Sequence, residues 1–356
     1  MKPVRGRGAV TNRDSGRFGL PARSADGDWL DSVVAIDGPA PRLRTQVQTI
    51  AARTILSRNA SPDIPFDRSI NAYAGCEHGC IYCYARPTHA FHDLSPGIDF
   101  ETRLFAKPDA AKLLRRELAA KTYAPAPIAM GTNTDPYQPI ERTYRLTRQI
   151  LEVCAELRHP VTITTKSARV LDDIDLLADM ARDNLVAVAI SVTTLDARLS
   201  ATLEPRASTP ENRLAAIARL AEAGVHVGVN VSPIIPAITD EWIEAILARA
   251  GAAGAQSASW IAVRLPHEVA PLFREWLQAH FPDRADKVMA TIRSLRGGRD
   301  NDPAFFTRMK PQGVWADLIR TRFRIARKRA GIPQLRPNLD CSRFRRPAPD
   351  GQLTLF

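Results

Sequence analysis

The chain has 356 residues, of which 45% are hydrophobic and 24% are charged, a balance typical of a soluble globular protein rather than a disordered one. No apolar run reaches the roughly 18 residues that a transmembrane helix needs, so we expect no segment that spans a membrane. The chain has five cysteines, an odd number, which does not suit a disulfide framework, and we expect a cytoplasmic, reducing location. The net charge of +11 directs attention to polyanionic partners.

Residues 1–62 are rich in Arg, Gly, Ser and Asp, which predicts a basic, mostly irregular leader. The segment lacks the apolar stretch of a secretory signal. Positive charge gathers here and again near the C-terminus. The two groups are Arg5, Arg7, Arg13, Arg17, Arg23, Arg42, Arg44, Arg53 and Arg58, and then Arg320, Arg322, Arg324, Arg327, Lys328, Arg329, Arg336, Arg343, Arg345 and Arg346. Such blocks bind polyanions by releasing counterions, and a solvated surface is the alternative.

Residues 63–264 alternate short apolar runs, rich in β-branched residues, with segments of helical periodicity. We expect strands at residues 69–73, 128–131, 161–165, 185–192, 225–231 and 260–263. We expect the intervening helices at residues 110–120, 143–157, 171–182, 210–223 and 241–250. This alternation predicts an α/β fold of about six right-handed βαβ units, too few for a closed eight-stranded barrel.

Cys76, Cys80 and Cys83 form a C-x3-C-x2-C motif directly after the first expected strand. Zinc sites commonly use two pairs of ligands, and ferredoxin-type motifs supply four thiolates, but no second pair and no fourth cysteine stand here. Three thiolates can hold three corners of an iron–sulfur cubane and leave the fourth iron open. A Cys3His zinc site that includes His78 is the alternative.

The C-x3-C-x-aromatic-C pattern looks like the signature of the radical S-adenosylmethionine superfamily. The wider stretch NAYAGCEHGCIYCYARPTHAF resembles the spore-photoproduct-lyase-like branch, and the resemblance extends over roughly residues 65–300. It implies a partial (β/α)6 barrel and a [4Fe-4S] cluster whose open iron binds S-adenosylmethionine. It also implies reductive cleavage of that cofactor to a 5′-deoxyadenosyl radical, with an electron donor such as flavodoxin or ferredoxin.

The resemblance assigns expected roles to residues near the motif and after the second strand. Tyr82 is expected beside the adenine, and Tyr84 is a candidate hydrogen-atom relay. In the stretch GTNTDPYQPIE, Gly131 fits a close backbone approach to the cofactor, and Thr134 is a candidate contact for its carboxylate. Thr132 stands where lesion-repairing relatives carry a hydrogen-donating cysteine, which argues against thymine-dimer reversal.

Later strand ends supply further candidates. Lys166 is expected to bind the cofactor carboxylate through a charge-assisted hydrogen bond. Ser191 and Thr193 are expected ribose contacts, and Pro233 resembles the segment that stacks on adenine. In residues 203–208, Glu204 and Arg206 form an expected ion pair beside the site. Ordinary capping of strand and helix ends is the alternative for each of these residues.

Residues 265–332 have helical periodicity and are expected to form a helical extension, and the proline-rich residues 333–356 a flexible tail. Cys154 is expected to be a small core residue. Cys341 lies in the expected tail, where a mobile thiol could reach the site.

The chain ends in Gln352, Leu353, Thr354, Leu355 and Phe356, which resembles the pentapeptide that binds the bacterial sliding clamp. Gln352, Leu353, Leu355 and Phe356 are the expected contacts, and an apolar C-terminus that packs on the body of the protein is the alternative. A flexible tail of about 20 residues would leave such a peptide accessible, because it spans on the order of 25 Å.

Two classes of function remain open at this point. One is a radical S-adenosylmethionine enzyme that acts on DNA in repair or modification, with RNA or protein as alternative substrates. The other is a noncatalytic iron–sulfur protein that senses redox state while it binds nucleic acid. The polar residues at the strand ends favour the enzyme, because a sensor needs no cofactor pocket.

Overall fold

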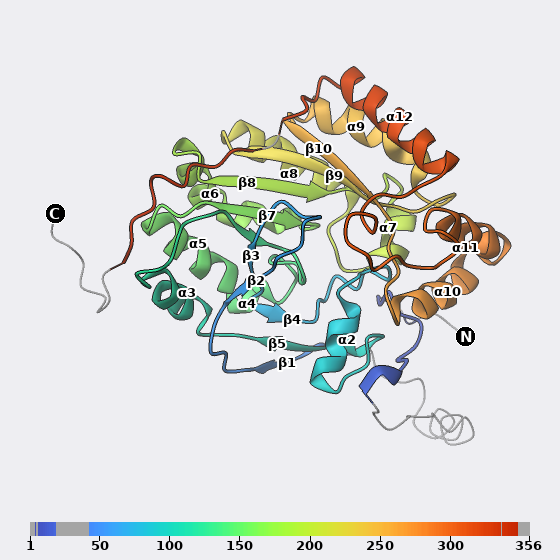
Figure 1. The fold of residues 1–356 in the computed structure, drawn as a ribbon, viewed down its shortest axis with the longest axis horizontal. Coiled ribbons are helices and arrows are strands. Elements are labelled where there is room, and N and C mark those ends of the chain that lie inside the picture. The colour runs from blue at the N-terminus through green and yellow to red at the C-terminus, as the bar shows by residue number, and fades with distance from the viewer. Residues whose placement is uncertain (1–3, 5, 19–42, 336, 348–356) are drawn as a thin grey trace.

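The computed structural model describes residues 4, 6–18, 43–335 and 337–347, and its centre is a seven-stranded sheet in the order β10-β9-β8-β7-β6-β3-β2 (Figure 1). All neighbours pair in parallel except β2 and β3, which are antiparallel. The strands are β2 (Leu56–Arg58), β3 (Arg68–Ile70), β6 (Ile128–Met130), β7 (Val161–Thr165), β8 (Val186–Ser191), β9 (His226–Ile234) and β10 (Ser257–Ala262). The six parallel strands confirm the predicted partial barrel.

Helices connect the parallel strands, and each longer helix packs its apolar face against the sheet. The connecting helices are α3 (Ala110–Leu118), α4 (Glu141–Tyr144), α5 (Leu146–Glu156), η3 (Ala168–Asp173), α6 (Ile174–Arg182), α7 (Ala197–Leu203), α8 (Pro210–Glu222), η4 (Asp240–Trp242) and α9 (Ile243–Ala252). Local sequence sets several of their starts. The Thr209 hydroxyl accepts a hydrogen bond from the Asn212 amide, and Pro210 occupies the first turn, where its missing N–H costs nothing. Cys154 lies fully buried in α5, as predicted.

A second, three-stranded sheet flanks the barrel in the order β1-β5-β4. It consists of β1 (Gln46–Thr49), β4 (Tyr73–Ala74) and β5 (Arg103–Ala106), and η1 (Gly16–Phe18), η2 (Arg86–His92) and α2 (Asp99–Thr102) accompany it. The expected irregular leader thus contributes β1 to this sheet and β2 to the barrel. Both strands are short and mostly exposed, so neither carries the apolar alternation that reveals a strand in sequence.

The helical extension comprises α10 (Val269–His280), η5 (Pro282–Arg284), α11 (Ala285–Ser294) and α12 (Val314–Arg329). Helix α12 packs along α9 through Ile319, Phe323 and Ala326, and its opposite face is basic. Helices α10 and α11 share a hydrophobic cluster with α7 and with Ile81 of the cysteine loop, residues 75–85. No helix in the described parts of the chain is long and apolar enough to cross a membrane.

Residues 337–347 lie against the barrel, although the sequence predicted a flexible tail from residue 333. The Arg345 amide donates to the Leu157 carbonyl at 2.8 Å, and the Phe344 ring lies 5.2 Å from that of His159. These contacts are at the N-terminal ends of the parallel strands. Cys341 is therefore held at the edge of the sheet opposite the cysteine loop, which excludes the alternative that its thiol reaches the site. The prolines suggested a flexible tail, but the apolar side chains of Leu339 and Phe344 pack against the protein and hold the segment in place.

Candidate functional site

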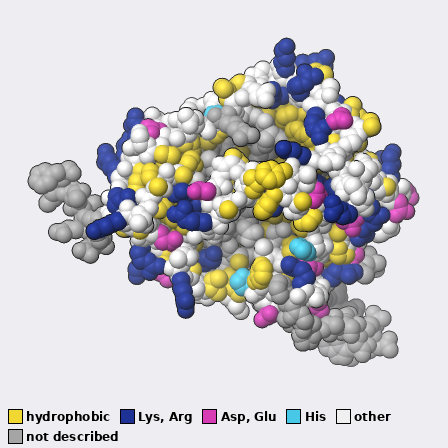
Figure 2. All heavy atoms as spheres, viewed as in Figure 1, with side chains coloured by type: hydrophobic (Ala, Val, Ile, Leu, Met, Phe, Trp, Pro, Cys, Tyr) yellow, Lys and Arg dark blue, Asp and Glu magenta, His cyan; other side chains and the backbone are white. Residues whose placement is uncertain are grey.

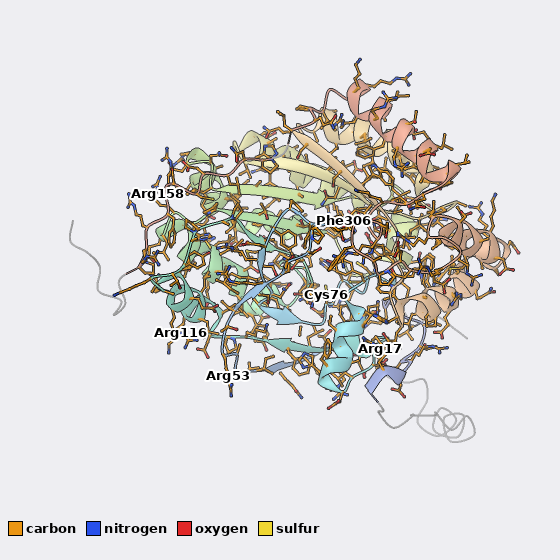
Figure 3. All side chains as sticks on the ribbon, viewed as in Figure 1. Arg17, Arg53, Cys76, Arg116, Arg158 and Phe306 are labelled. Carbon is orange, nitrogen blue, oxygen red and sulfur yellow. The ribbon has the colours of Figure 1, made fainter. Side chains whose placement is uncertain are left out.

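The three motif cysteines lie on the cysteine loop, which follows β4 near the centre of the molecule (Figure 3). Cys76 and Cys80 are buried, Cys83 is partly exposed, and all three thiols are free. Burial raises the pKa of the Cys80 thiol to about 12 and that of Cys76 well above its ordinary value. A metal that takes these sulfurs as ligands must therefore displace their protons.

Arg86 fixes the backbone of the cysteine loop from within. Its guanidinium is fully buried and donates to the carbonyls of Gly79 at 3.0 Å and Cys80 at 2.9 Å. The same group forms an ion pair with Glu101 at 2.5 Å. Gly79 has φ +65°, and a Cβ there would meet the Glu101 carboxylate at 2.7 Å, so the turn between the first two cysteines requires glycine.

The N-terminal segment 6–15 lies directly against the cysteine loop. The amides of Gly8 and Ala9 donate to the two oxygens of the Glu101 carboxylate at 3.0 and 2.9 Å, and Arg7 donates to the Glu101 carbonyl at 2.8 Å. A Cβ at Gly8 would stand 1.8 Å from the Gly79 carbonyl oxygen. This contact was not predicted from the sequence, in which its only signal is a glycine next to an arginine in the leader.

Asp135 ties the cysteine loop to the ends of β6 and β7. Its carboxylate pairs with His78 Nδ1 at 3.3 Å and accepts from the Lys166 amide at 2.8 Å. Burial favours the neutral carboxyl, yet His78 and the hydrogen bonds lower the pKa of Asp135 to about 2. His78 is thus engaged by a carboxylate rather than by the thiols, which argues against the Cys3His zinc alternative. Within the described residues, no three His, Cys, Asp or Glu side chains are grouped to hold one metal ion, the three motif cysteines included. An iron–sulfur cubane instead takes each thiol on a different iron.

A buried network orients Tyr82. Its hydroxyl donates to Glu204, which also accepts from Thr193 Oγ1 at 2.6 Å and pairs with the fully buried Arg213. The expected Glu204–Arg206 ion pair is wrong, because Arg206 pairs instead with Glu77 at 3.0 Å. Both carboxylates nevertheless hold the cysteine loop in place. Glu204 does so through Tyr82, and Glu77 does so from within the loop through its pair with Arg206.

Lys166 lies over the Tyr82 ring, with Nζ 5.9 Å from the ring centroid. Burial alone would lower the pKa of Lys166, but the acidic groups of Cys80 and Glu204 outweigh it and raise the pKa. The ammonium is therefore charged, and the described side chains form no close ion pair with it. This cation can bind the carboxylate of a ligand placed above Tyr82.

The loop after β6 is organised by Asn71, a residue that the sequence analysis did not single out. Its side-chain oxygen accepts from the Asn133 amide at 3.1 Å and lies 3.4 Å from the Thr132 hydroxyl. The Thr134 hydroxyl donates to the Tyr73 carbonyl at 3.3 Å, so its proton is already used. Gly131 has φ +85°, and a Cβ there would meet the Thr164 carbonyl at 1.9 Å, so the close approach is to β7.

The remaining predicted residues occupy the same edge of the sheet. Ser191 is the buried last residue of β8, and its carbonyl accepts from Arg213 at 3.0 Å. Pro233 lies near the end of β9. Tyr84 is 52% exposed, and its hydroxyl donates to the Thr132 carbonyl. The strand ends thus bring the predicted residues to the edge at which the cysteine loop lies.

Residues 70–250, about half of the chain, match the profile of the Radical SAM superfamily. The chain therefore belongs to this superfamily and is a radical S-adenosylmethionine enzyme. Membership implies a [4Fe-4S] cluster and S-adenosylmethionine, and it sets aside the noncatalytic sensor.

Among its relatives, "Uncharacterized protein Rv2578c" of Mycobacterium tuberculosis is 36% identical over 232 residues, which span 65% of this chain and 68% of the relative. "Radical SAM Nalpha-GlyT isomerase" of Pseudomonas phage M6 is 27% identical over 222 residues, or 62% and 44% of the two chains. The fold is similar to that of a spore photoproduct lyase complexed with dinucleoside spore photoproduct, at TM-score 0.56 and 16% identity, covering 80% of this chain and 79% of the other.

The contact between segment 6–15 and the cysteine loop can be tested with Gly8→Ala. The added methyl must push Gly8 away from the Gly79 carbonyl, which should lower the free energy of unfolding by about 1 to 3 kcal/mol. Gly16→Ala is the matched control, because a Cβ there meets nothing within 4 Å. Urea unfolding compares the two variants, and equal stabilities would contradict the contact.

Proposed function

We propose that Cys76, Cys80 and Cys83 hold the [4Fe-4S] cluster and that the enzyme acts on DNA in repair or modification. The observation that carries the cluster assignment is the cysteine loop itself. Its three thiols come from one buried loop whose backbone is bonded on several sides, and neither Cys154 nor Cys341 lies on that loop. The bound cluster would supply one-electron cleavage of S-adenosylmethionine, with flavodoxin or ferredoxin as the electron source.

The chain's own groups would bind and orient the cofactor. Lys166 offers a charged ammonium to its carboxylate, and the anchored Tyr82 ring offers a fixed face to its adenine. The hydroxyls of Thr134 and Thr193 donate within the protein, so they would serve a ligand as acceptors. Further proposed contacts are Gly131, Ser191 and Pro233, with Tyr84 as the proposed catalytic residue.

Two observations support DNA as the substrate. The fold is similar to that of a spore photoproduct lyase complexed with a dinucleoside photoproduct. Basic side chains lie around the edges of the face in Figure 2, and Arg324, Lys328 and Arg329 are exposed on α12 without a paired carboxylate among the described residues. RNA and protein stay alternative substrates.

The positive charge of the leader supports DNA binding less than the sequence suggested. Arg13 pairs with Glu275 of α10, and Arg17 pairs with Glu268, the N-cap of α10.

We also propose that the C-terminal peptide recruits the enzyme to the sliding clamp. Residues 352–356 lie outside the described part of the structure, so the proposal rests on their sequence pattern.

Cluster binding predicts that Cys80→Ala loses the broad absorption at about 400 nm and most of its iron after anaerobic reconstitution. Cys341→Ser should keep both, because that thiol lies at the opposite edge of the sheet. The unchanged protein, reduced with dithionite, should release 5′-deoxyadenosine, and duplex DNA should change the yield. Full iron content in Cys80→Ala, or no cleavage by a protein with an intact cluster, would contradict the assignment.

Lys166→Ala should weaken S-adenosylmethionine binding roughly 30-fold, which corresponds to about 2 kcal/mol for a lost charge-assisted hydrogen bond. The cluster absorption should stay, since the Lys166 side chain makes no bond to the cysteine loop backbone among the described contacts. Lys112→Ala on the exposed face of α3 is the control. Equilibrium dialysis measures the affinity, and unchanged binding by Lys166→Ala would refute the role.

If the basic residues of α12 contact DNA phosphates, they contribute to the slope of DNA affinity against salt concentration. The triple variant Arg324→Gln, Lys328→Gln, Arg329→Gln should reduce that slope by up to about 3, since each lost phosphate contact accounts for about 0.9. The matched control removes equal charge at Arg182, Arg219 and Arg249, each paired with a carboxylate. Equal slopes for both triple variants, measured by fluorescence anisotropy, would exclude α12 as a DNA contact.

A labelled peptide of residues 347–356 should bind purified sliding clamp with micromolar affinity, on the order of −8 kcal/mol. Leu355→Ala with Phe356→Ala should abolish binding, because each side chain contributes roughly 1.5 to 3 kcal/mol when buried. Thr354→Ser should leave the affinity of the peptide for the clamp unchanged. Equal anisotropy changes for the unchanged and doubly substituted peptides would refute recruitment by this route.

A further inference from the structure

Residues 299–313, here called the bridging loop, connect α11 to α12 and contact both edges of the seven-stranded sheet. At one edge, Asp63 between β2 and β3 accepts from the Phe306 amide and from Arg308 Nε, both at 2.7 Å. At the other, Arg296 donates to the Arg308 carbonyl at 3.0 Å and to the Val263 carbonyl, just after β10, at 2.9 Å. Since β2 and β10 are the outermost strands, the loop links the two sides of the open barrel.

The bridging loop displays two phenyl rings to solvent. Phe305 is 53% exposed and Phe306 63% exposed, and the Arg308 guanidinium lies 4.6 Å from the centre of the Phe305 ring. Figure 3 shows Phe306 in the middle of this face, where Figure 2 shows hydrophobic side chains with basic ones beside them. Phe306 has φ +68°, a backbone conformation that is unfavourable for an aromatic residue.

Arg264 connects the bridging loop to the cysteine loop. It follows β10, and its Nη1 lies 3.1 Å from the sulfur of Met309 in the bridging loop. Its Nε is buried without a hydrogen-bond partner among the described groups. Burial and the neighbouring Arg308 lower the pKa of Arg264, and Tyr84, the residue directly after Cys83, lies close enough to offset this lowering in part. Arg264 therefore lies near both the bridging loop and Tyr84.

We propose that Phe305 and Phe306 stack on a nucleobase taken out of the duplex and that Arg264 binds a phosphate of the same strand. This inference rests on the proposed action on DNA and names how the substrate is held. A chemical step on a base requires the base to leave the helical stack, and aromatic side chains replace the lost stacking. The Arg308 guanidinium lies against the Phe305 ring, which suits a nucleic acid better than an apolar peptide, since a peptide would need an apolar groove.

The test uses the reconstituted holoprotein, a single-stranded DNA 12-mer, and a duplex with one mismatched 2-aminopurine. The double variant Phe305→Ala, Phe306→Ala should bind the 12-mer about 10-fold to 100-fold more weakly, as expected for lost base stacking, with the salt slope unchanged. It should also lose the fluorescence change of the 2-aminopurine. Phe305→Tyr with Phe306→Tyr should restore both, because tyrosine keeps an aromatic face. Arg264→Gln should instead lower the salt slope by about 1.

Phe91→Ala is the control for an exposed aromatic ring elsewhere, since Phe91 is 70% exposed on η2. Cleavage of S-adenosylmethionine without DNA should be equal in the unchanged protein, the two Phe305/Phe306 double variants and Phe91→Ala, which separates substrate holding from cofactor chemistry. If the unchanged protein binds DNA and the double alanine variant binds it equally, the stacking role is overturned and a peptide-docking surface is favoured. If the unchanged protein binds no DNA, the proposed action on DNA fails and this inference fails with it.

Discussion

The fully buried ion pair between Arg86 and Glu101 is the constraint on which the geometry of the site depends. A charge in the protein interior must be paired and hydrogen-bonded, because its desolvation costs several kcal/mol. Glu101 meets this requirement with Arg86 and the amides of Gly8 and Ala9, and Arg86 meets it with carbonyls of the cysteine loop. The pair thus joins the N-terminal segment, α2 and the cysteine loop, and it fixes the backbone that carries the three thiols.

A second set of carboxylates attaches this assembly to the barrel. Asp135 joins His78 of the cysteine loop to the ends of β6 and β7, and Glu204 joins Tyr82 to Arg213 of α8. Each acidic group accepts several donors, so little conformational freedom remains around the loop. A ligand at this edge therefore meets a preformed surface, in which few polar groups still have an unused proton or charge. Lys166 is prominent among these, which is why it is central to the proposed cofactor site.

The features of the superfamily and the proposed DNA contacts lie in different parts of the chain. The barrel and the cysteine loop carry the features of the superfamily, whereas the bridging loop and α12 come from the helical extension beyond residue 264. Loops that extend from a rigid scaffold vary more freely than the strands that carry them. The exposed rings of Phe305 and Phe306 are therefore the part of this chain in which we look for substrate recognition.

The sequence by itself determined the cysteine motif, the six parallel strands and most connecting helices, because these follow from spacing and periodicity within short stretches. It also placed Lys166 and Tyr82 correctly at one edge, since strand order fixes where strand ends meet. Only the tertiary structure decided which partner each charge takes. Glu204 pairs with Arg213 rather than with Arg206, and Glu101 accepts a hydrogen bond from the Gly8 amide, 93 residues away in sequence. Strand β1 and the docked Phe344 were likewise beyond prediction. Their stability comes from contacts between residues distant in sequence, which local patterns do not encode.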